Sequence, residues 1–389
     1  MSKVNELIRE KCPNGVEYKN VKELCLENFW VMPSTPKFQT EGVPYITSKN
    51  IRNGDVMFDD VKYITYSDFK DISNNRPIKE ADFLISMIGT IGEVGIVKQE
   101  DLPFYGQNMY LLRLNTRLIN IKYFYHYFTS DIVRKVLLGE KNNGNQGYLR
   151  TKNIESLKVP VPPLEVQEEI VRVLDKFCNL EAMLEMELDA RKSQFEFWSR
   201  FLFDNVNGEK IKLGDLLDYI QPTKYIVNST EYSDEYSIPV LTAGQTFILG
   251  YTNEINNIYN ASKDSPVIIF DDFTTSNHWV DFEFKVKSSA MKILVPKTEN
   301  NFKYIYYAIK NIKYEAKEHA RQWIQNYSNF EIKVPSIDIQ NNIVKILDKF
   351  DFLINDMSVG IPAEIKLRRQ QYEYYRNQLL NFEELKYEE

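Results

Sequence analysis

Apolar residues follow two different spacings along this chain, and each spacing predicts its own kind of element. Between residues 166 and 184, and again between 339 and 357, they recur at alternating intervals of four and three residues, which is typical of an amphipathic helix with a heptad stripe. Shorter apolar runs bounded by Gly and Asn predict strands. The predicted strands are 43–47, 83–88, 110–114, 238–242, 267–270 and 291–295, and two aromatic-rich helices are predicted at 121–128 and 302–309.

One segment of the chain occurs twice. The sequence VPPLEVQEEIVRVLDKF at 161–177 returns as VPSIDIQNNIVKILDKF at 334–350, 173 positions later. This period is long enough to hold a whole domain and a helix, unlike the 20 to 50 residues of solenoid repeats. The chain therefore divides into a first globular domain (1–160), a central long helix (161–206), a second globular domain (207–333) and a C-terminal long helix (334–389). The fold class predicted is α+β, with a pseudo-twofold internal repeat.

The two long helices differ at one place. Residues 191–198 match 368–375 with an offset of 177, so the second copy has gained four residues, about one helical turn. The gain falls at Gly360, Ile361 and Pro362, where Gly and Pro predict a kink or a break.

The matched stripes predict that the two long helices pack antiparallel as a coiled coil and hold the two domains at opposite ends. The predicted seam consists of Ile170, Val173, Phe177, Leu180, Leu184, Ile343, Ile346, Phe350, Leu353 and Met357. Heptads this short leave two alternatives open, namely helices that each dock on their own domain and a coiled coil between two copies of the chain.

Charge is unevenly distributed along the chain. The net charge is −7, which is unusual for a protein that binds nucleic acid. Residues 1–160 carry +3 and 210–333 carry −1, whereas 161–209 carry −6 and 334–389 carry −3. The acid therefore lies in the helical segments, which suit a protein partner, and the globular domains could contact nucleic acid locally.

The chain has three cysteines without metal-ligand spacing and only three histidines, so we expect no metal site and a cytoplasmic location. It has no apolar run of membrane-spanning length, so we expect no contact with a membrane. The first residues also lack the apolar region of a signal peptide.

Amide-rich, basic loops precede both copies of the repeat, at 140–153 and 317–327. Arg and Lys suit guanine edges and phosphate, and Asn and Gln suit adenine, so these loops predict DNA contact. A solvated loop before a helix is the alternative for each. The candidate DNA-binding residues are Lys49, Arg52, Gln107, Asn108, Lys141, Asn143, Asn145, Gln146, Tyr148, Arg150, Lys152, Gln245, Thr274, Thr275, Asn277, His278, Trp279, Lys317, His319, Arg321, Gln322, Trp323 and Gln325.

Two further motifs have some features of catalytic sites. Residues 89–95 (GTIGEVG) lack the spacing of a phosphate-binding loop and predict a tight hairpin. Asp272 with Glu283 and Lys285 imitates a metal-dependent nuclease, but such short matches are common and the first half has no counterpart. The chain is predicted to be non-catalytic; a stand-alone nuclease or a coiled-coil scaffold that ignores DNA are the alternatives.

The starts of both long helices (163–171 and 335–344) and the segment 361–376 resemble the conserved regions of the specificity subunit of type I restriction–modification enzymes, and the 89–97 hairpin is similar to one in that family's target-recognition domains. The resemblance covers the whole chain. It implies a DNA-binding subunit without an active site, in which each globular domain is a target-recognition domain that reads one half of a bipartite double-stranded DNA target.

The same resemblance implies that the helices fix the spacer between the half-sites. It also implies assembly with two adenine-N6 methyltransferase subunits and with ATP-driven restriction subunits. No cofactor is expected on this chain, and S-adenosylmethionine, ATP and Mg²⁺ are expected on the partner subunits.

Overall fold

The computed structural model describes residues 2–89, 91–139, 149–242, 246–314, 321–356 and 358–385. Contacts divide the chain into two units, of which unit 1 comprises 1–185 with 364–389 and unit 2 comprises 186–363. The boundaries cut both long helices, so each unit contains one globular domain together with parts of the two helices. The boundaries of the four segments expected from the sequence therefore remain a prediction.

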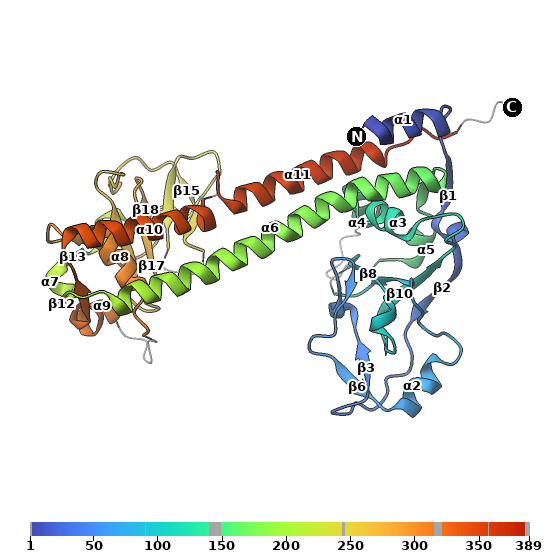
Figure 1. Cartoon of the computed structure of the whole chain (residues 1–389), viewed down its shortest axis with the longest axis horizontal. Helices are drawn as coiled ribbons and strands as arrows, with labels where there is room; N and C mark the ends of the chain where they lie inside the picture. The colour runs from blue at the N-terminus through green and yellow to red at the C-terminus, as the bar shows by residue number, and fades with distance from the viewer. Residues whose placement is uncertain are drawn as a thin grey trace. The chain divides into compact units, whose positions relative to one another are not determined.

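Among the described residues, the first domain contains four sheets, one of which is the small β4–β5 pair, together with helices α2 to α5. Its main sheet has the strand order β2-β10-β7-β8, a second has the order β6-β3-β9, and β1 pairs with β11 (Figure 1). The strands are β1 (Glu17–Asn20), β2 (Cys25–Val31), β3 (Val43–Ile46), β4 (Ile51–Arg52), β5 (Asp55–Val56), β6 (Lys62–Ile64), β7 (Phe83–Ser86), β8 (Val94–Ile96), β9 (Tyr105–Gly106), β10 (Met109–Leu114) and β11 (Lys158–Val161). The helices are α2 (Tyr66–Ser73), α3 (Ile121–Phe128), α4 (Asp131–Gly139) and α5 (Thr151–Glu155), and α1 (Ser2–Lys11) precedes β1.

The described part of the second domain repeats the other three sheets. Its main sheet has the order β13-β19-β16-β17, its second sheet has the order β15-β14-β18, and β12 pairs with β20. The strands are β12 (Glu209–Lys212), β13 (Leu217–Ile220), β14 (Ile238–Leu241), β15 (Ile248–Thr252), β16 (Val267–Asp271), β17 (Asn277–Val280), β18 (Lys285–Val286), β19 (Met291–Pro296) and β20 (Glu331–Val334). The helices are α7 (Leu213–Leu216), α8 (Phe302–Lys310) and α9 (Gln322–Gln325).

All six strands and both aromatic helices expected from the apolar runs are present, as β3, β7, β10, β14, β16, β19, α3 and α8. The two halves also agree in pairing, since β3 and β14 each bond one antiparallel and one parallel neighbour. The internal repeat and the α+β class are therefore confirmed.

Both long helical regions are present, and the second is interrupted where the sequence predicts a kink or a break. Helix α6 runs from Leu164 to Asn205, α10 from Ile337 to Asn355 and α11 from Ile361 to Leu379. The break between α10 and α11 lies at the four-residue gain. There, the Asp356 carboxylate accepts hydrogen bonds from the backbone N–H groups of Ser358 and Val359, and a Cβ on Gly360 would lie 2.6 Å from the Asp356 carbonyl oxygen.

A buried glutamine fixes the start of α6 to the first domain. The Gln167 side-chain oxygen accepts the backbone N–H of Asn120 at 2.7 Å, and its amide donates to the carbonyls of Leu118 and Pro162. Asn120 in turn caps α3 by accepting from Lys122 and Tyr123 N–H groups. The amide of Gln167 thus joins the helix cap, the loop before it and the corner that leads into α6.

Gln340 makes the same arrangement in unit 2. Its side-chain oxygen accepts the Asn301 N–H at 2.9 Å, and its amide donates to the Pro335 carbonyl and the Asn300 side chain. Asn301 caps α8 as Asn120 caps α3. The glutamine that the sequence repeats at 167 and 340 is therefore a structural residue.

Within unit 1, α11 packs antiparallel against the first half of α6. The Phe177 ring stacks on the Tyr375 ring with centroids 5.3 Å apart, and Arg369 pairs with Glu185 at 2.7 Å and with Glu181. This confirms the antiparallel packing over that stretch of the two helices.

The same helix pair is bonded to α3 through His126. His126 is buried, with Nε2 3.0 Å from an Asp175 carboxylate oxygen and Nδ1 2.9 Å from the Tyr372 hydroxyl. Burial alone would raise the pKa of Asp175, but the hydrogen bonds from His126 and Lys122 hold it below the usual value. The buried Tyr372 hydroxyl has its pKa raised by burial.

The first turns of each predicted seam face their own domain. Ile170, Val173 and Ile343 belong to the domain cores, while Ile346 and Leu353 are 41% and 39% exposed. In α10 the buried positions are Gln340, Ile343, Val344, Leu347 and Ile354, which follow the helical period of 3.6. Ile343, Val344 and Leu347 share a core cluster with α8. The first turns of α6 and α10 thus dock on their own domains, which is the alternative that the short heptads left open. Met357, the last residue of the predicted seam, lies outside the described residues.

We predict that Gln167→Ala destabilises unit 1. The substitution leaves a buried N–H and two carbonyls unsatisfied, so the free energy of unfolding should fall by about 3 kcal/mol. Urea denaturation of the full chain measures the loss, and Glu168→Ala at the neighbouring exposed position is the matched control. Equal stability of the two variants would contradict the role assigned to the glutamine.

Candidate nucleic-acid interface

A tight turn between β16 and β17 presents short polar side chains in the second domain. The Asp271 carboxylate accepts from the N–H groups of Phe273 and Thr274 and from the Thr274 hydroxyl at 2.5 Å. Thr275 has φ 65° and is buried, so it shapes the turn. Thr274 and Ser276 are left exposed at its tip, and Asn277 is half-buried at the start of β17.

His278 on β17 forms a ring stack beside this turn. Its imidazole lies on the Phe247 ring with centroids 4.0 Å apart and planes 16° from parallel. Burial lowers the pKa of His278, the Lys310 charge lowers it further, and Asp271 opposes them. The imidazole is therefore held toward its neutral form, which has one donor and one acceptor for a hydrogen bond.

Two of the aromatic and amide candidates in the second domain are buried inside it, and a third, Trp279, is half-buried. Trp279 lies against Phe302 and Tyr306, with the Lys303 ammonium 5.5 Å from its ring. Gln322 and Trp323 are each 2% exposed. The core encloses the side chains of Gln322 and Trp323 in this structure, and their contact with DNA stays a prediction.

Asp272 fastens α9 to the β16–β17 turn. Its carbonyl accepts the Gln322 N–H at 2.8 Å and its carboxylate accepts the Trp323 N–H at 2.9 Å. The other carboxylate oxygen lies 3.5 Å from the Lys292 ammonium, which donates to the Gln221 side chain. Asp272 is therefore a buried structural carboxylate.

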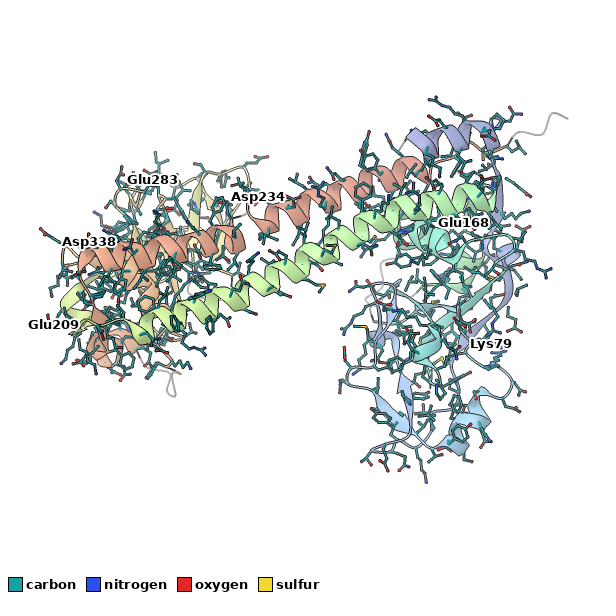
Figure 2. The ribbon with its side chains drawn as sticks, viewed as in Figure 1. Lys79, Glu168, Glu209, Asp234, Glu283 and Asp338 are labelled. Atoms are coloured by element: carbon teal, nitrogen blue, oxygen red, sulfur yellow. The ribbon has the colours of Figure 1, made fainter. Side chains whose placement is uncertain are left out.

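The nuclease-like constellation does not assemble. Lys285 is buried and pairs with Glu254 at 3.1 Å, Asp272 faces Lys292, and Glu283 lies exposed at the edge of unit 2 (Figure 2). In the described ranges, no group of three or more His, Cys, Asp or Glu residues could hold a metal ion. The structure thus gives the nuclease alternative no support.

The first domain has a hairpin at the equivalent place, between β7 and β8. The strands pair antiparallel, Ile88 and Gly89 are exposed near the tip, and Gly92 has φ 84°. The hairpin predicted from the glycine-rich motif is confirmed. Leu149 is buried in the core with Met87 and Val94 and lies next to Gly92.

Helix α5 follows Leu149 and is fixed to the sheet. The Glu155 carboxylate accepts from the Tyr110 hydroxyl at 2.6 Å and from the Asn28 amide at 3.1 Å, and Ile154 is fully buried. The residues at the start of α5 therefore have a fixed position, and Arg150 and Lys152 there are exposed.

Four other candidates of the first domain have partners within the chain. Lys49 pairs with Asp60 at 2.7 Å and Arg52 with Asp59 at 2.9 Å, although all four side chains are exposed. The Gln107 side chain accepts from the Tyr45 hydroxyl, and the Asn108 carbonyl accepts from Ser48. Asn108 also has φ 66°, which gives it a place in the turn before β10.

Eight candidates lie outside the described residues, namely Lys141, Asn143, Asn145, Gln146, Tyr148, Gln245, Lys317 and His319. Among the described candidates, Arg150, Lys152, Thr274, Arg321 and Gln325 are exposed. The sequence analysis missed the structural roles of Gln167 and Gln340, although their recurrence in both copies of the repeat was a signal for them.

Across the described ranges, no helix combines the length and the apolar character that a bilayer crossing requires.

We predict that the Phe247→Ala substitution raises the pKa of His278. Removing the ring exposes the imidazole to water, so its pKa should move up toward the ordinary value of 6.5. In the wild-type chain the lowered pKa means that stability falls as pH drops through 6.5, because the unfolded state binds the proton more readily. NMR titration of the His278 ring measures both values, and an unchanged pKa in the variant would contradict the burial argument.

Comparison with known proteins identifies relatives over most of the chain. The sequence matches the family described as type I restriction modification DNA specificity domain at residues 13–190 and 205–367. It is 52% identical over 194 residues to the Escherichia coli EcoR124I/EcoR124II specificity subunit, a match that spans 47% of each protein. It is 28% identical over 285 residues to a putative type I specificity subunit of Haemophilus influenzae, covering 68% of this chain and 73% of the relative.

Solved structures show the same fold. The S subunit of the type I restriction–modification system of M. genitalium matches with a TM-score of 0.56 at 15% identity, over 95% of this chain and 98% of that one. A chain from a structural study of assembly of the type I system matches with a TM-score of 0.55 at 13% identity, over the same shares. The two matched ranges, which cover most of the sequence, show that the chain belongs to the type I restriction–modification DNA specificity family.

Proposed function

We propose that this chain is the DNA-recognition subunit of a type I restriction–modification complex, without an active site of its own. The observation that carries the proposal is the duplicated domain, in which matching sheets present different side chains at the equivalent β7–β8 and β16–β17 turns. Two domains of one architecture with different exposed residues suit a bipartite target, of which each domain reads one half.

The helices have a separate role in this proposal. They fix the spacer between the half-sites and dock two adenine-N6 methyltransferase subunits, and restriction subunits join the same complex. The acidic balance of 161–209 and 334–389 and the exposed aromatic side chains of Phe197, Trp198 and Phe201 on α6 support contact with protein. S-adenosylmethionine, ATP and Mg²⁺ belong to the partner subunits.

We expect that co-expression with the methyltransferase subunit encoded beside this chain methylates adenine at one bipartite motif. Mapping N6-methyladenine across the host genome measures this, with the methyltransferase expressed alone as the control. Methylation at one interrupted motif would establish recognition and reveal both half-sites. A stable complex that methylates no motif would instead favour a scaffold.

We expect that deletion of four residues around Gly360, between α10 and α11, changes the preferred spacer or weakens binding. The second helical region exceeds the first by four residues at this place, and the deletion removes no residue of either globular domain. The methylation map of the variant should show both original half-sites with a different spacing, or fewer modified sites. An unchanged spacer with full modification would refute the role of the helices as a ruler.

A further inference from the structure

Two arginines occupy equivalent places in the two domains. Arg150 directly precedes α5 and Arg321 directly precedes α9, and each stands at the N-cap position of its helix. Both short helices lead into the strand that closes the domain, β11 in the first and β20 in the second. Because β1 pairs with β11 as β12 pairs with β20, the two arginines lie at matching points of the repeated fold.

Each arginine is held beside the turn of its main sheet. In the first domain, Leu149 packs next to Gly92 of the β7–β8 hairpin. In the second, Asp272 at the end of β16 bonds the N–H groups of Gln322 and Trp323, the two residues after Arg321. The backbone at each arginine is therefore fixed before any ligand binds, which lowers the entropy lost on binding.

Both guanidinium groups are exposed, and neither has an anionic partner in the part of the chain that the structure describes. Neither Arg150 nor Arg321 forms an ion pair with another described residue, whereas Lys49 and Arg52 are paired with Asp60 and Asp59. An exposed, unpaired guanidinium on a fixed backbone suits an anion that arrives from outside the chain.

We propose that Arg150 and Arg321 are a matched pair of DNA-backbone anchors, each of which holds a phosphate of the half-site read by its own domain. This rests on the proposed function. The argument for phosphate is that the same residue recurs at the same place in two domains whose neighbouring turns differ. A side chain that reads a base should differ between two half-sites, whereas a phosphate contact is the same for any sequence.

The test measures binding of the full chain, assembled with its methyltransferase subunit, to two duplexes. One duplex carries the motif found by the methylation map, and the other carries a scrambled sequence of the same length. The variants are Arg150→Gln and Arg321→Gln, and Arg150→Lys keeps the charge. Arg117→Gln is the control, because Arg117 is exposed and unpaired among the described residues but lies in the turn before α3, beside the Leu118 carbonyl that Gln167 bonds.

Each Arg→Gln variant should bind both duplexes roughly fivefold or more weakly, with the ratio between the duplexes unchanged. The slope of log K against log salt should fall by about 1, and Arg150→Lys should restore most of it. Arg117→Gln should bind like the wild type. Thermal unfolding of each variant confirms that the fold is retained.

Three results would overturn the assignment or its basis. If both Gln variants keep the affinity and the salt slope of the wild type, the two arginines do not hold DNA phosphates. Weaker binding of the cognate duplex alone, with lost preference at one base, would make the arginine a base reader. If the wild-type complex binds both duplexes equally, the proposed function itself fails, and that outcome is separate from the other two.

Discussion

The fold depends on a primary amide that is buried in each unit and bonded on every side. Gln167 and Gln340 each connect an aromatic helix, the loop before it and the Pro-containing corner at the start of a long helix. A carboxylate or an apolar side chain could not replace the amide, because the site needs one acceptor and two donors. The direction in which each long helix leaves its domain is therefore set by hydrogen bonds, which are directional, as well as by apolar packing.

Aromatic and charged side chains extend this attachment along the helices. The position that is His126 on α3 is Tyr307 on α8, and both bond the aspartate of the repeated LDKF sequence, Asp175 and Asp348. Likewise Tyr372 covers His126 in unit 1 while Phe195 lies against Tyr307 in unit 2. The two units thus make equivalent contacts at this point through different side chains. This tolerance indicates that the aspartate needs a donor at that point and not a particular residue.

Much of the fold could be predicted because it follows from local pattern. Buried strands such as β7 and β16 are continuous apolar runs, and the Gly360–Pro362 interruption marks the end of a helix by steric and hydrogen-bonding rules. The face of α10 could not be predicted in this way. Over three turns a heptad and a period of 3.6 differ by less than one residue, so Ile346 and Leu353 fit a seam on paper but lie outside the buried face.

The candidate interface was less predictable, because residue type does not reveal burial in a loop. Trp323 and Gln322 have the composition of a DNA-reading loop, yet Asp272, far away in sequence, holds them inside the domain. The nuclease-like constellation does not form for the same reason. The Asp272 carboxylate instead lies against the Lys292 ammonium and accepts the Trp323 N–H. The arginines at 150 and 321 were visible in the sequence, but their equivalence depends on the strand pairing, which only the fold provides.

Unit 1 is assembled from segments that lie far apart in the chain. Leu379 and Leu380 belong to the core of the first domain, and Val16 exchanges backbone hydrogen bonds with Glu383 and Leu385. Because a ribosome makes the protein from its N-terminus, the first domain emerges early without these residues, whereas unit 2 is a continuous stretch, 186–363. The domain that is synthesised first is therefore the one whose core is completed last, and it must wait with apolar surface uncovered until the second domain has been made.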